Sequence, residues 1–442
     1  MRRFSTLLLL AALPAIAQPT TVKEFLAAAD AQNVDRRISI EQREKAVAEY
    51  RQAWTAMLPS LTLQGAWTRN QKEVSLDIAG QLTPLLTPVF QAVHVTPPDT
   101  ASSPTVITPL QQLDATLRVD LPLIDTTRWM RAVAANEVQL GAEERERVTR
   151  DLVRRQVVAA YYGYAAALAM KASALKALNA AELQLKLTTV RAEAGAVTEL
   201  DVLRARAEVA RNSQTVVDAN LLAVTTRRTL RTLSGVEAPD AVPLPTANLS
   251  LEPGFEELEK SVGELPAVRA AGHDAEAAGS MATMQKLALV PIIGAQFTER
   301  VTNATGFSGQ SAFWNTGLTA TWRLDAPTLM GIEAQARGQN IAALGVERAR
   351  LSAADQIHND WQRFSAALRK MESVDAQVAA AARAEQVARD RYAVGAATQL
   401  EVITSERDLF AAEFGQIQAL SDLATARLSL RLSAGRPLDD AP

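Results

Sequence analysis

A repeat with a spacing of 200 residues constrains the fold of this 442-residue chain more than any other feature. Residues 191–203 and 391–403 are two versions of one motif, with arginine, glycine, threonine, leucine and valine at equivalent positions. The similarity extends at the same offset, without a gap, over residues 116–235 and 316–435. Such a repeat predicts two similar structural halves. The matched residues that weigh most are Asp125/Asp325, Gly195/Gly395 and Gly235/Gly435.

Each motif lies between two long, alanine-rich segments whose apolar residues follow a helical period. A glycine followed three residues later by a threonine indicates a helix C-cap and then the N-cap of a returning helix. We therefore expect two helical hairpins, with tips near residues 195 and 395. The first approach helix, from Asp125 to about Ala194, contains no proline and would be roughly 100 Å long. Apolar and small residues at every seventh position after each tip indicate coiled-coil packing.

Two shorter helical segments precede the long ones. They cover residues 22–57 and 255–289, and each ends just before a proline, Pro59 or Pro291. Each return helix is only about half as long as its approach helix. We therefore expect each long helix to pack beside two short helices stacked end to end.

Four segments alternate apolar and polar residues, as strands with one apolar and one polar face do. Between the first two, residues 74–112 contain six prolines, which predicts a long, irregular, exposed loop. The last two are separated by a short turn at residues 303–309. The predicted strands are 61–69, 116–123, 293–298 and 313–324.

The composition disfavours several classes of function. With 46 basic and 49 acidic residues the net charge is −3, which argues against a nucleic-acid partner. Without cysteine there is no thiolate metal site and no catalytic thiol. The three histidines, His94, His273 and His358, show no serine, cysteine or carboxylate constellation around them. The sequence thus predicts no enzyme: no catalytic residue, no metal site and no cofactor.

The N-terminus predicts export. Arg2 and Arg3 precede an apolar core from Leu7 to Leu13, and residues 15–17 form a small-x-small cleavage signal. We expect a signal peptide over residues 1–17 and a mature chain that starts near Gln18. The core is too short for a membrane anchor, and later apolar runs fall short of the ~20 residues of a spanning helix. No cysteine follows the cleavage site, which excludes the lipid anchor of bacterial lipoproteins.

Four amphipathic strands in an exported protein favour a membrane barrel. One chain cannot close such a barrel, and its open edges require partners. A bilayer admits β structure only as a closed barrel with apolar residues outward, and three chains would supply twelve strands. Trp67, Trp314 and Trp322 would then lie at the membrane interface. The alternative is a pair of β-hairpins packed on the helices of a soluble protein.

Over essentially its whole mature length, the chain resembles the TolC-like outer-membrane efflux protein family. The residues that carry the resemblance are the motif Gly-x-x-x-x-Leu-[Asp/Glu]-Val-[Leu/Ile] at both tips and the helix-proline-strand and strand-aspartate-helix junctions. The resemblance implies a mainly α fold with β-hairpins, a two-repeat protomer with long periplasmic coiled-coil helices. Its four transmembrane strands would complete a twelve-stranded barrel in a homotrimer.

The implied function is that of the outer-membrane channel of a tripartite export system. It is a passive conduit from periplasm to exterior, surrounded by outer-membrane lipid and served by a periplasmic adaptor (membrane fusion) protein and an inner-membrane pump. Small-molecule efflux is the expected role. Type I protein secretion uses the same conduit and remains an alternative, as does a periplasmic coiled-coil scaffold without a pore.

The expected domain organisation follows the repeat. Residues 18–235 form the first repeat, with a β-hairpin at 60–123, and a connector covers 236–254. Residues 255–435 form the second repeat, with a β-hairpin at 292–324. A C-terminal tail covers 436–442.

The resemblance also assigns residues at the tips. Tyr392, Asp201 and Glu401 match positions that hold the periplasmic mouth closed in the family. The best-known members carry an arginine where Ala397 lies and an aspartate where Thr404 lies, so the closure here would be weaker or built differently. Alternatively, Asp201 and Glu401 suit the dipole in the first turn of a helix.

The tip segments are the predicted contacts for the adaptor, with ordinary helix capping as the alternative. They are Gly195, Ala196 and Val197 in the first repeat and Gly395, Ala396 and Ala397 in the second.

Overall fold

The computed structural model describes residues 21–96 and 104–438, in two compact units. One unit contains the chain up to Lys45 and residues 140–273 and 344–442, and the other contains residues 46–139 and 274–343. The predicted signal peptide and the last four residues of the predicted tail lie outside the described residues. No helix of the described segments has the length and apolar character that crossing a membrane requires.

Two helices of 68 residues confirm the predicted long elements: α4 (Thr126–Glu193) and α8 (Ala326–Ala393). Matched aspartates cap both. The Asp125 carboxylate accepts hydrogen bonds from the backbone N–H groups of Thr127 and Arg128, at 3.1 and 3.0 Å. The Asp325 carboxylate accepts one from Thr328 N–H at 2.9 Å. The strand-to-helix junctions of the two repeats therefore use the same N-cap.

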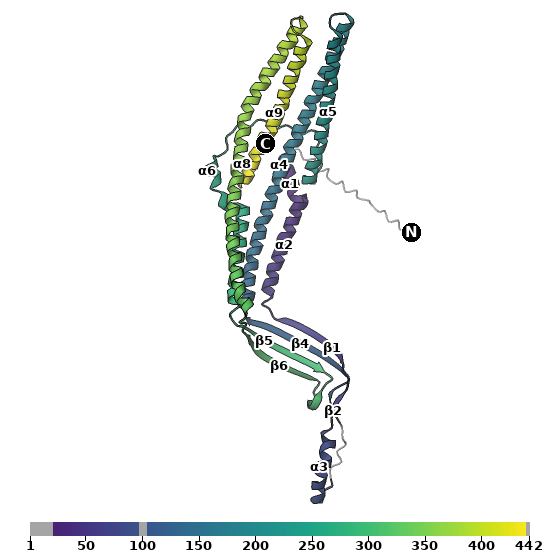
Figure 1. The fold of residues 1–442 in the computed structure, drawn as a ribbon, viewed down its shortest axis with the longest axis vertical. Helices are drawn as coiled ribbons and strands as arrows, with labels where there is room; N and C mark the ends of the chain where they lie inside the picture. Colours follow the sequence, from purple (N-terminus) through teal and green to yellow (C-terminus); the bar gives the residue numbers. More distant parts are fainter. Residues whose placement is uncertain (1–20, 97–103, 439–442) are drawn as a thin grey trace, which may run out of the picture. The chain divides into compact units, whose positions relative to one another are not determined.

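The return helices are α5 (Glu199–Ser234) and α9 (Gln399–Ser433), and each forms a helical hairpin with the long helix before it (Figure 1). Two apolar clusters stabilise the first unit, which contains both hairpin tips. One is built around Phe25, Tyr162 and Leu230, and the other around Ile357, Phe364 and Leu430. The connector 236–254 has no regular secondary structure and packs on α9 through Arg427, which donates to Asn248 O and Ser250 O.

The short helices are more divided than the sequence predicts. Residues 22–57 form α1 (Val22–Gln32) and α2 (Val34–Thr55). Residues 255–289 form α6 (Phe255–Glu259), the 3-10 turn η1 (Val262–Glu264) and α7 (Pro266–Leu287). Asn33 interrupts the first segment because its amide donates to Leu233 O at 2.9 Å, at the C-terminus of α5. Similarly, Ser261 Oγ donates to Ala434 O at 3.2 Å, at the end of α9. The short helices thus meet the return helices end to end, as expected.

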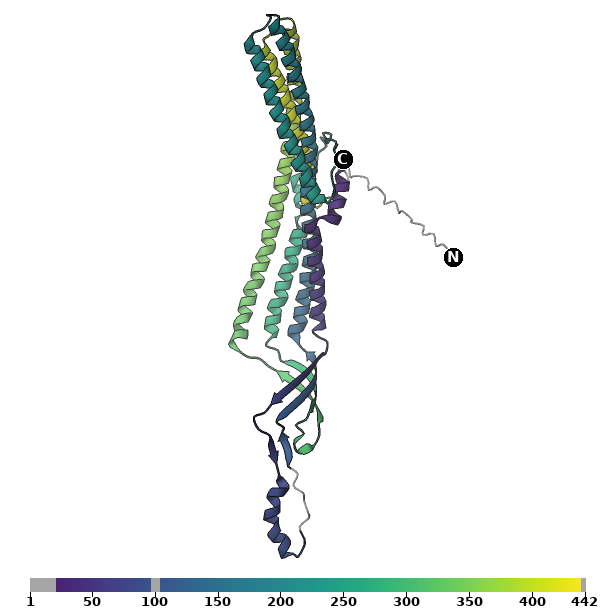
Figure 2. The same cartoon turned by 90° about the vertical axis from the view of Figure 1, so that its right-hand side faces the viewer.

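The second unit contains an antiparallel sheet in the order β1-β4-β5-β6 (Figure 2). The register places apolar partners on one face, such as Leu61, Val119 and Phe297. The opposite face carries polar partners such as Thr62, Arg118 and Thr298. β1 and β6 leave the two edges of this sheet open. The strands are β1 (Ser60–Arg69), β4 (Gln111–Ile124), β5 (Ile292–Thr302) and β6 (Ala312–Thr321), with a 3-10 turn η2 (Gly306–Ser308) between the last two.

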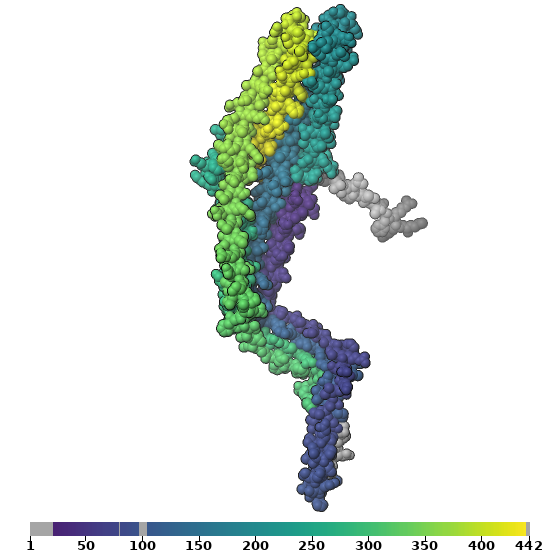
Figure 3. Space-filling model, viewed as in Figure 1, coloured from purple at the N-terminus to yellow at the C-terminus, as the bar shows by residue number. Residues whose placement is uncertain are grey.

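The prediction of an irregular loop over residues 74–112 is wrong. A two-stranded ladder, β2 (Val74–Leu76) with β3 (Thr105–Thr108), carries helix α3 (Ile78–Ala92) (Figure 1). The space-filling view shows the atoms of this segment extending beyond those of the sheet (Figure 3). Pro84 and Pro88 lie inside this helix, where each removes one backbone hydrogen bond. The Asp77 side chain nevertheless caps the helix by accepting from Gly80 N–H at 2.7 Å. The helical spacing of the apolar residues in 78–89 therefore indicated the structure of this segment better than its prolines did.

Candidate functional site at the hairpin tips

The two tips share one backbone geometry. Gly195 and Gly395 have φ angles of 72° and 77°, a conformation that glycine adopts without steric cost. The next N–H group, of Ala196 or Ala396, donates to the carbonyl of Arg191 or Arg391 at 2.8 Å in both copies. This six-to-one bond closes a Schellman C-cap, as the sequence predicts. Of the predicted contact residues, Val197 and Ala397 are half-buried and the other four are exposed.

The two predicted gate carboxylates, Asp201 and Glu401, lie in the first turns of the return helices. Thr198 N–H donates to Asp201 Oδ2 at 3.1 Å, and Thr398 N–H donates to Glu401 Oε2 at 3.2 Å. In the second copy, Glu401 N–H also donates to Thr398 Oγ1 at 3.3 Å. Each carboxylate therefore belongs to a capping box in the first turn of its helix, the turn in which the alternative interpretation expects it to interact with the helix dipole.

Tyr392 makes no hydrogen bond to either of those carboxylates in the described chain. Within the described chain its hydroxyl is buried and has no hydrogen-bond partner. The Arg191 guanidinium carbon lies 5.0 Å from the centroid of the Tyr392 ring, which is cation–π geometry between the two hairpins. Both residues line a cleft of about 280 Å³ together with Thr188 and Glu406. The structure therefore joins Tyr392 to the opposite hairpin through its ring.

Sequence reasoning missed a buried hydrogen bond at the second tip. Gln399 Nε2, in the first turn of α9, donates to Thr188 Oγ1 of α4 at 3.3 Å, and both side chains are buried. The equivalent residue in the first repeat, Glu199, is exposed. The available signal is this difference between the two copies, because only the second has a neutral amide at this position.

An ionic cluster farther from the tips also joins the hairpins and was not predicted. Arg407 of α9 donates to Glu208 of α5, with Nε 3.0 Å from Oε2 and a second, shorter bond from the terminal nitrogen. Arg389 of α8 pairs with Glu406 of α9 at 3.0 Å and with Glu385 of its own helix. The first-repeat equivalents of Arg407, Arg389 and Glu385 are Ala207, Thr189 and Leu185. Arg407, which reaches α5 of the other hairpin, thus has no charged counterpart in the first repeat.

The pKa values of two ionisable groups in this cluster are shifted, for different reasons. Burial raises the pKa of the Glu406 carboxyl above its ordinary value of 4.5, and the hydrogen bond and charge of Arg389 oppose the shift. The hydrogen bond to Glu208 raises the pKa of Arg407. Arg407 therefore stays charged at all ordinary pH values. Of these two residues, Glu406 is the one whose charge responds to mild acid.

The three predicted interfacial tryptophans are all exposed. Trp67 on β1 and Trp314 on β6 have 62% and 67% of their surface accessible, and Trp322, just after β6, has 64%. Trp314 stacks on Phe297, with the ring centroids 6.4 Å apart. Trp322 Nε1 donates to Leu289 O at 2.8 Å, so its polar end is satisfied.

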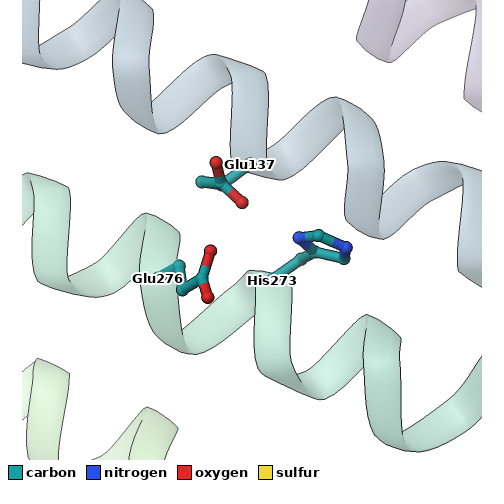
Figure 4. A group of neighbouring side chains, drawn as sticks. All are labelled: Glu137, His273 and Glu276. Atoms are coloured by element: carbon teal, nitrogen blue, oxygen red, sulfur yellow. The ribbon is translucent and has the colours of Figure 1, made fainter. Parts of the chain in front are cut away.

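The expectation that no histidine has carboxylates around it is wrong for His273. Figure 4 shows His273 and Glu276 on α7 and Glu137 on α4. Their possible ligand atoms all lie within 4.8 Å of one another. Glu276 is one helical turn from His273, whereas Glu137 comes from a helix 136 positions earlier, which periodicity alone does not bring into contact. Glu276 is exposed and the other two are half-buried, as surface ion pairs often are.

Comparisons with known proteins agree on one fold. The sequence model of a family described as outer membrane efflux protein matches residues 28–236 and 258–436. A search of curated proteins gave no match. The outer membrane protein VceC from Vibrio cholerae is similar, with 18% identity and a TM-score of 0.74 over 94% of this chain and 96% of that one.

Two further solved structures are similar over most of their length. For the open state of the Neisseria gonorrhoeae MtrE outer membrane channel, the identity is 16% and the TM-score is 0.75, over 94% of this chain and 89% of that one. For the Campylobacter jejuni CmeC outer membrane channel, the values are 12% and 0.76, over 94% and 85%. At such identities the likeness establishes the fold.

Proposed function

The chain belongs to the outer membrane efflux protein family, and on this premise we propose that it is the outer-membrane component of a tripartite export system. Members of the family are channels of the outer membrane and not enzymes. The proposed function therefore requires no catalytic residues. The proposal concerns its assembly, its partners and its substrate.

The observation that supports the assembly best is the two-faced sheet. Leu61, Leu63 and Leu318 on the apolar face are 70%, 76% and 76% exposed, which would be costly in water. The strands have 10 to 14 residues, enough to cross a bilayer when tilted. Three copies that pair β1 of one chain with β6 of the next would close a twelve-stranded barrel and satisfy every edge.

The tryptophans fit the two borders of such a barrel. Trp67 lies near the C-terminal end of β1, and Trp314 lies near the N-terminal end of β6. Trp322 lies at the other end of β6, next to α8. Aromatic girdles flank the apolar band of outer-membrane barrels on both sides. We assign these residues to the two interfaces on that basis.

The tips are proposed as the docking site of a periplasmic adaptor and, through it, of an inner-membrane pump. Val394, Leu200 and Leu400, beside the two tips, are 77%, 53% and 49% exposed. Exposed apolar residues at the end of a hairpin, next to a rigid Schellman turn, are suited to insertion into a partner's groove. The contact segments are those at Gly195 and Gly395.

We further propose that the closed periplasmic mouth depends on the contacts between hairpins. Tyr392 contributes through its ring on Arg191, and the pairs Gln399–Thr188 and Arg407–Glu208 support it. Asp201 and Glu401 contribute mainly charge near the mouth, because their hydrogen bonds are used in capping. No arginine stands at Ala397, so these contacts replace the family's link.

Small-molecule efflux is the proposed role, and type I protein secretion is the second candidate. A passive tunnel carries what its pump delivers, so the test is made in cells. Deletion of the gene should sensitise the cells to small toxic compounds and leave the secreted proteins unchanged. Loss of one secreted protein without sensitisation would instead support secretion.

The channel itself is tested in planar bilayers. The purified protein should give discrete conductance steps whose size increases when the tip contacts are broken. A preparation that never conducts, in either form, would support the scaffold without a pore.

A further inference from the structure

Helix α3 presents an apolar stripe that the rest of the described chain, residues 21–96 and 104–438, does not cover. Leu85 and Val89 are 72% and 58% exposed, and Ile78 and Leu82 are both 47% exposed. Both views of the fold show α3 extending away from the four-stranded sheet (Figures 1 and 2). A contiguous exposed apolar stripe of this kind marks an interaction surface.

The spacing of these residues is that of a helix–helix contact. Ile78, Leu82, Leu85 and Val89, here called the α3 seam, are separated by four, three and four residues. This alternation places them at successive core positions of a heptad repeat. Pro84, Thr87 and Gln91 lie on the opposite side of the helix and Pro88 lies on its flank, so neither proline occupies a seam position.

The charge pattern selects the kind of partner. Residues 78–98 contain no aspartate, glutamate, lysine or arginine. Helices that lie on a membrane surface carry lysine and arginine on their polar face, and α3 carries neither. A charged partner would find no complementary group. Identical copies of α3, in contrast, can approach one another without like-charge repulsion.

The position of α3 in the chain brings such copies together. Asn70 N–H donates to Leu110 O at 2.9 Å and its side-chain amide donates to Pro109 O at 2.8 Å, which join the β2–β3 ladder to the end of the β1–β4 pair. The helices α2 and α4 connect to the opposite ends of these strands, at Ser60 and Ile124. The ladder and α3 therefore follow the end of the sheet remote from the helices. In the proposed channel this end is the exterior mouth.

We propose that the three copies of α3 in the homotrimer pack along the α3 seam into a parallel three-helix cap over the exterior mouth of the barrel. The inference rests on the trimer of the proposed function. A helix of 15 residues is marginal by itself in water. Tethering three copies to one barrel raises their effective concentration, so that helix formation and packing occur together.

Because the natural chain contains no cysteine, single cysteines test the cap cleanly. Leu85→Cys places a thiol in the α3 seam, and Gln91→Cys is the matched control on the opposite side of the same helix. Both variants are purified in mild detergent, the mass of the native complex is measured, and the samples are then oxidised. The proposal predicts a disulfide-linked pair of chains in most Leu85→Cys trimers and only background linkage for Gln91→Cys.

The outcomes separate the cap from the channel. Intact trimers in which Leu85→Cys links no better than Gln91→Cys would overturn the cap and leave the channel proposal in place. Failure to form a trimer would overturn both. If Leu85→Cys is shielded from a water-soluble maleimide in lipid vesicles but forms no disulfide, α3 inserts into the membrane and the cap is refuted. A Leu82→Gln/Leu85→Gln variant should still form trimers and show larger conductance steps.

Discussion

Arg407 on α9 holds the carboxylate of Glu208 on α5, 199 residues earlier in the chain, through two hydrogen bonds to one oxygen. The Glu208 side chain is only 8% exposed, whereas that of Arg407 is 40% exposed. The two helical hairpins of the repeat are therefore joined by an ion pair between residues that the repeat does not equate.

Replacing Arg407 with alanine should loosen this contact. Because Glu208 would remain buried without its cation, we expect a loss of about 1–2 kcal/mol, reduced from the value for a buried pair because Arg407 is partly exposed. The measurement is the urea midpoint of the purified protein, together with its conductance, which should rise. The control is Arg204→Ala, whose partner Asp201 lies 3.8 Å away on the same helix. Equal effects of both variants would argue against a special role for the cross-hairpin pair.

Mild acid should strengthen the packing around Glu406. Burial raises the pKa of this carboxyl in the folded protein above its ordinary value of 4.5, so the folded state binds the proton more tightly than the unfolded state. Stability attributable to Glu406 is therefore highest below about pH 4.5 and falls as the pH rises through the folded pKa. Glu406→Gln should abolish this part of the slope of the thermal midpoint against pH. The exposed neighbour Asp408→Asn should retain it; an unchanged slope in Glu406→Gln would contradict the assignment.

Tyr392 should act through its ring and not through its hydroxyl. Since the hydroxyl has no partner in the described chain, Tyr392→Phe should change the free energy of unfolding by less than about 0.5 kcal/mol and leave the conductance unaltered. Tyr392→Ala removes the contact with Arg191 and should raise the conductance. A raised conductance in Tyr392→Phe would instead show that the hydroxyl bonds a group of a neighbouring chain.

Glu401 combines a capping role with a charge, and two substitutions separate them. Glu401→Gln keeps the capping geometry because glutamine also serves in a capping box, but removes the charge. Glu401→Ala removes both and should cost about 0.5 kcal/mol of helix stability in addition. If three copies ring a narrow mouth, both variants should lose cation preference, as measured by reversal potentials. Unchanged ion selectivity in Glu401→Gln would remove Glu401 from the mouth.

Much of the fold could be predicted because it depends on sequence patterns among neighbouring residues. The glycine and threonine of each tip, the capping aspartates Asp125 and Asp325 and the alternating strands each determine local structure from neighbouring residues. The repeat then reduced the problem to one half of the chain. The breaks in the two short helical segments, near Asn33 and Ser261, were not predicted, because the partners of these residues, Leu233 and Ala434, are 200 and 173 residues away.

Less of the candidate site could be predicted from the sequence, because its contacts also join residues that are far apart in the chain. The sequence places Asp201 and Glu401 in the first turns of the return helices, as the structure does, but it did not predict their capping boxes. Thr188–Gln399 and Glu208–Arg407 pair residues across the two repeats, which no local pattern reports. The helix α3 was missed because the prolines at 84 and 88 were taken as breakers, although both lie on one side of an apolar helix.

The central claim is that three copies of this chain form one outer-membrane channel. The most direct test is the mass of the protein extracted from the outer-membrane fraction in mild detergent, with cross-linking before denaturation. The account predicts a complex of three chains that requires detergent to stay in solution. A monomer or dimer that is soluble without detergent would contradict it, although the helical hairpins would remain.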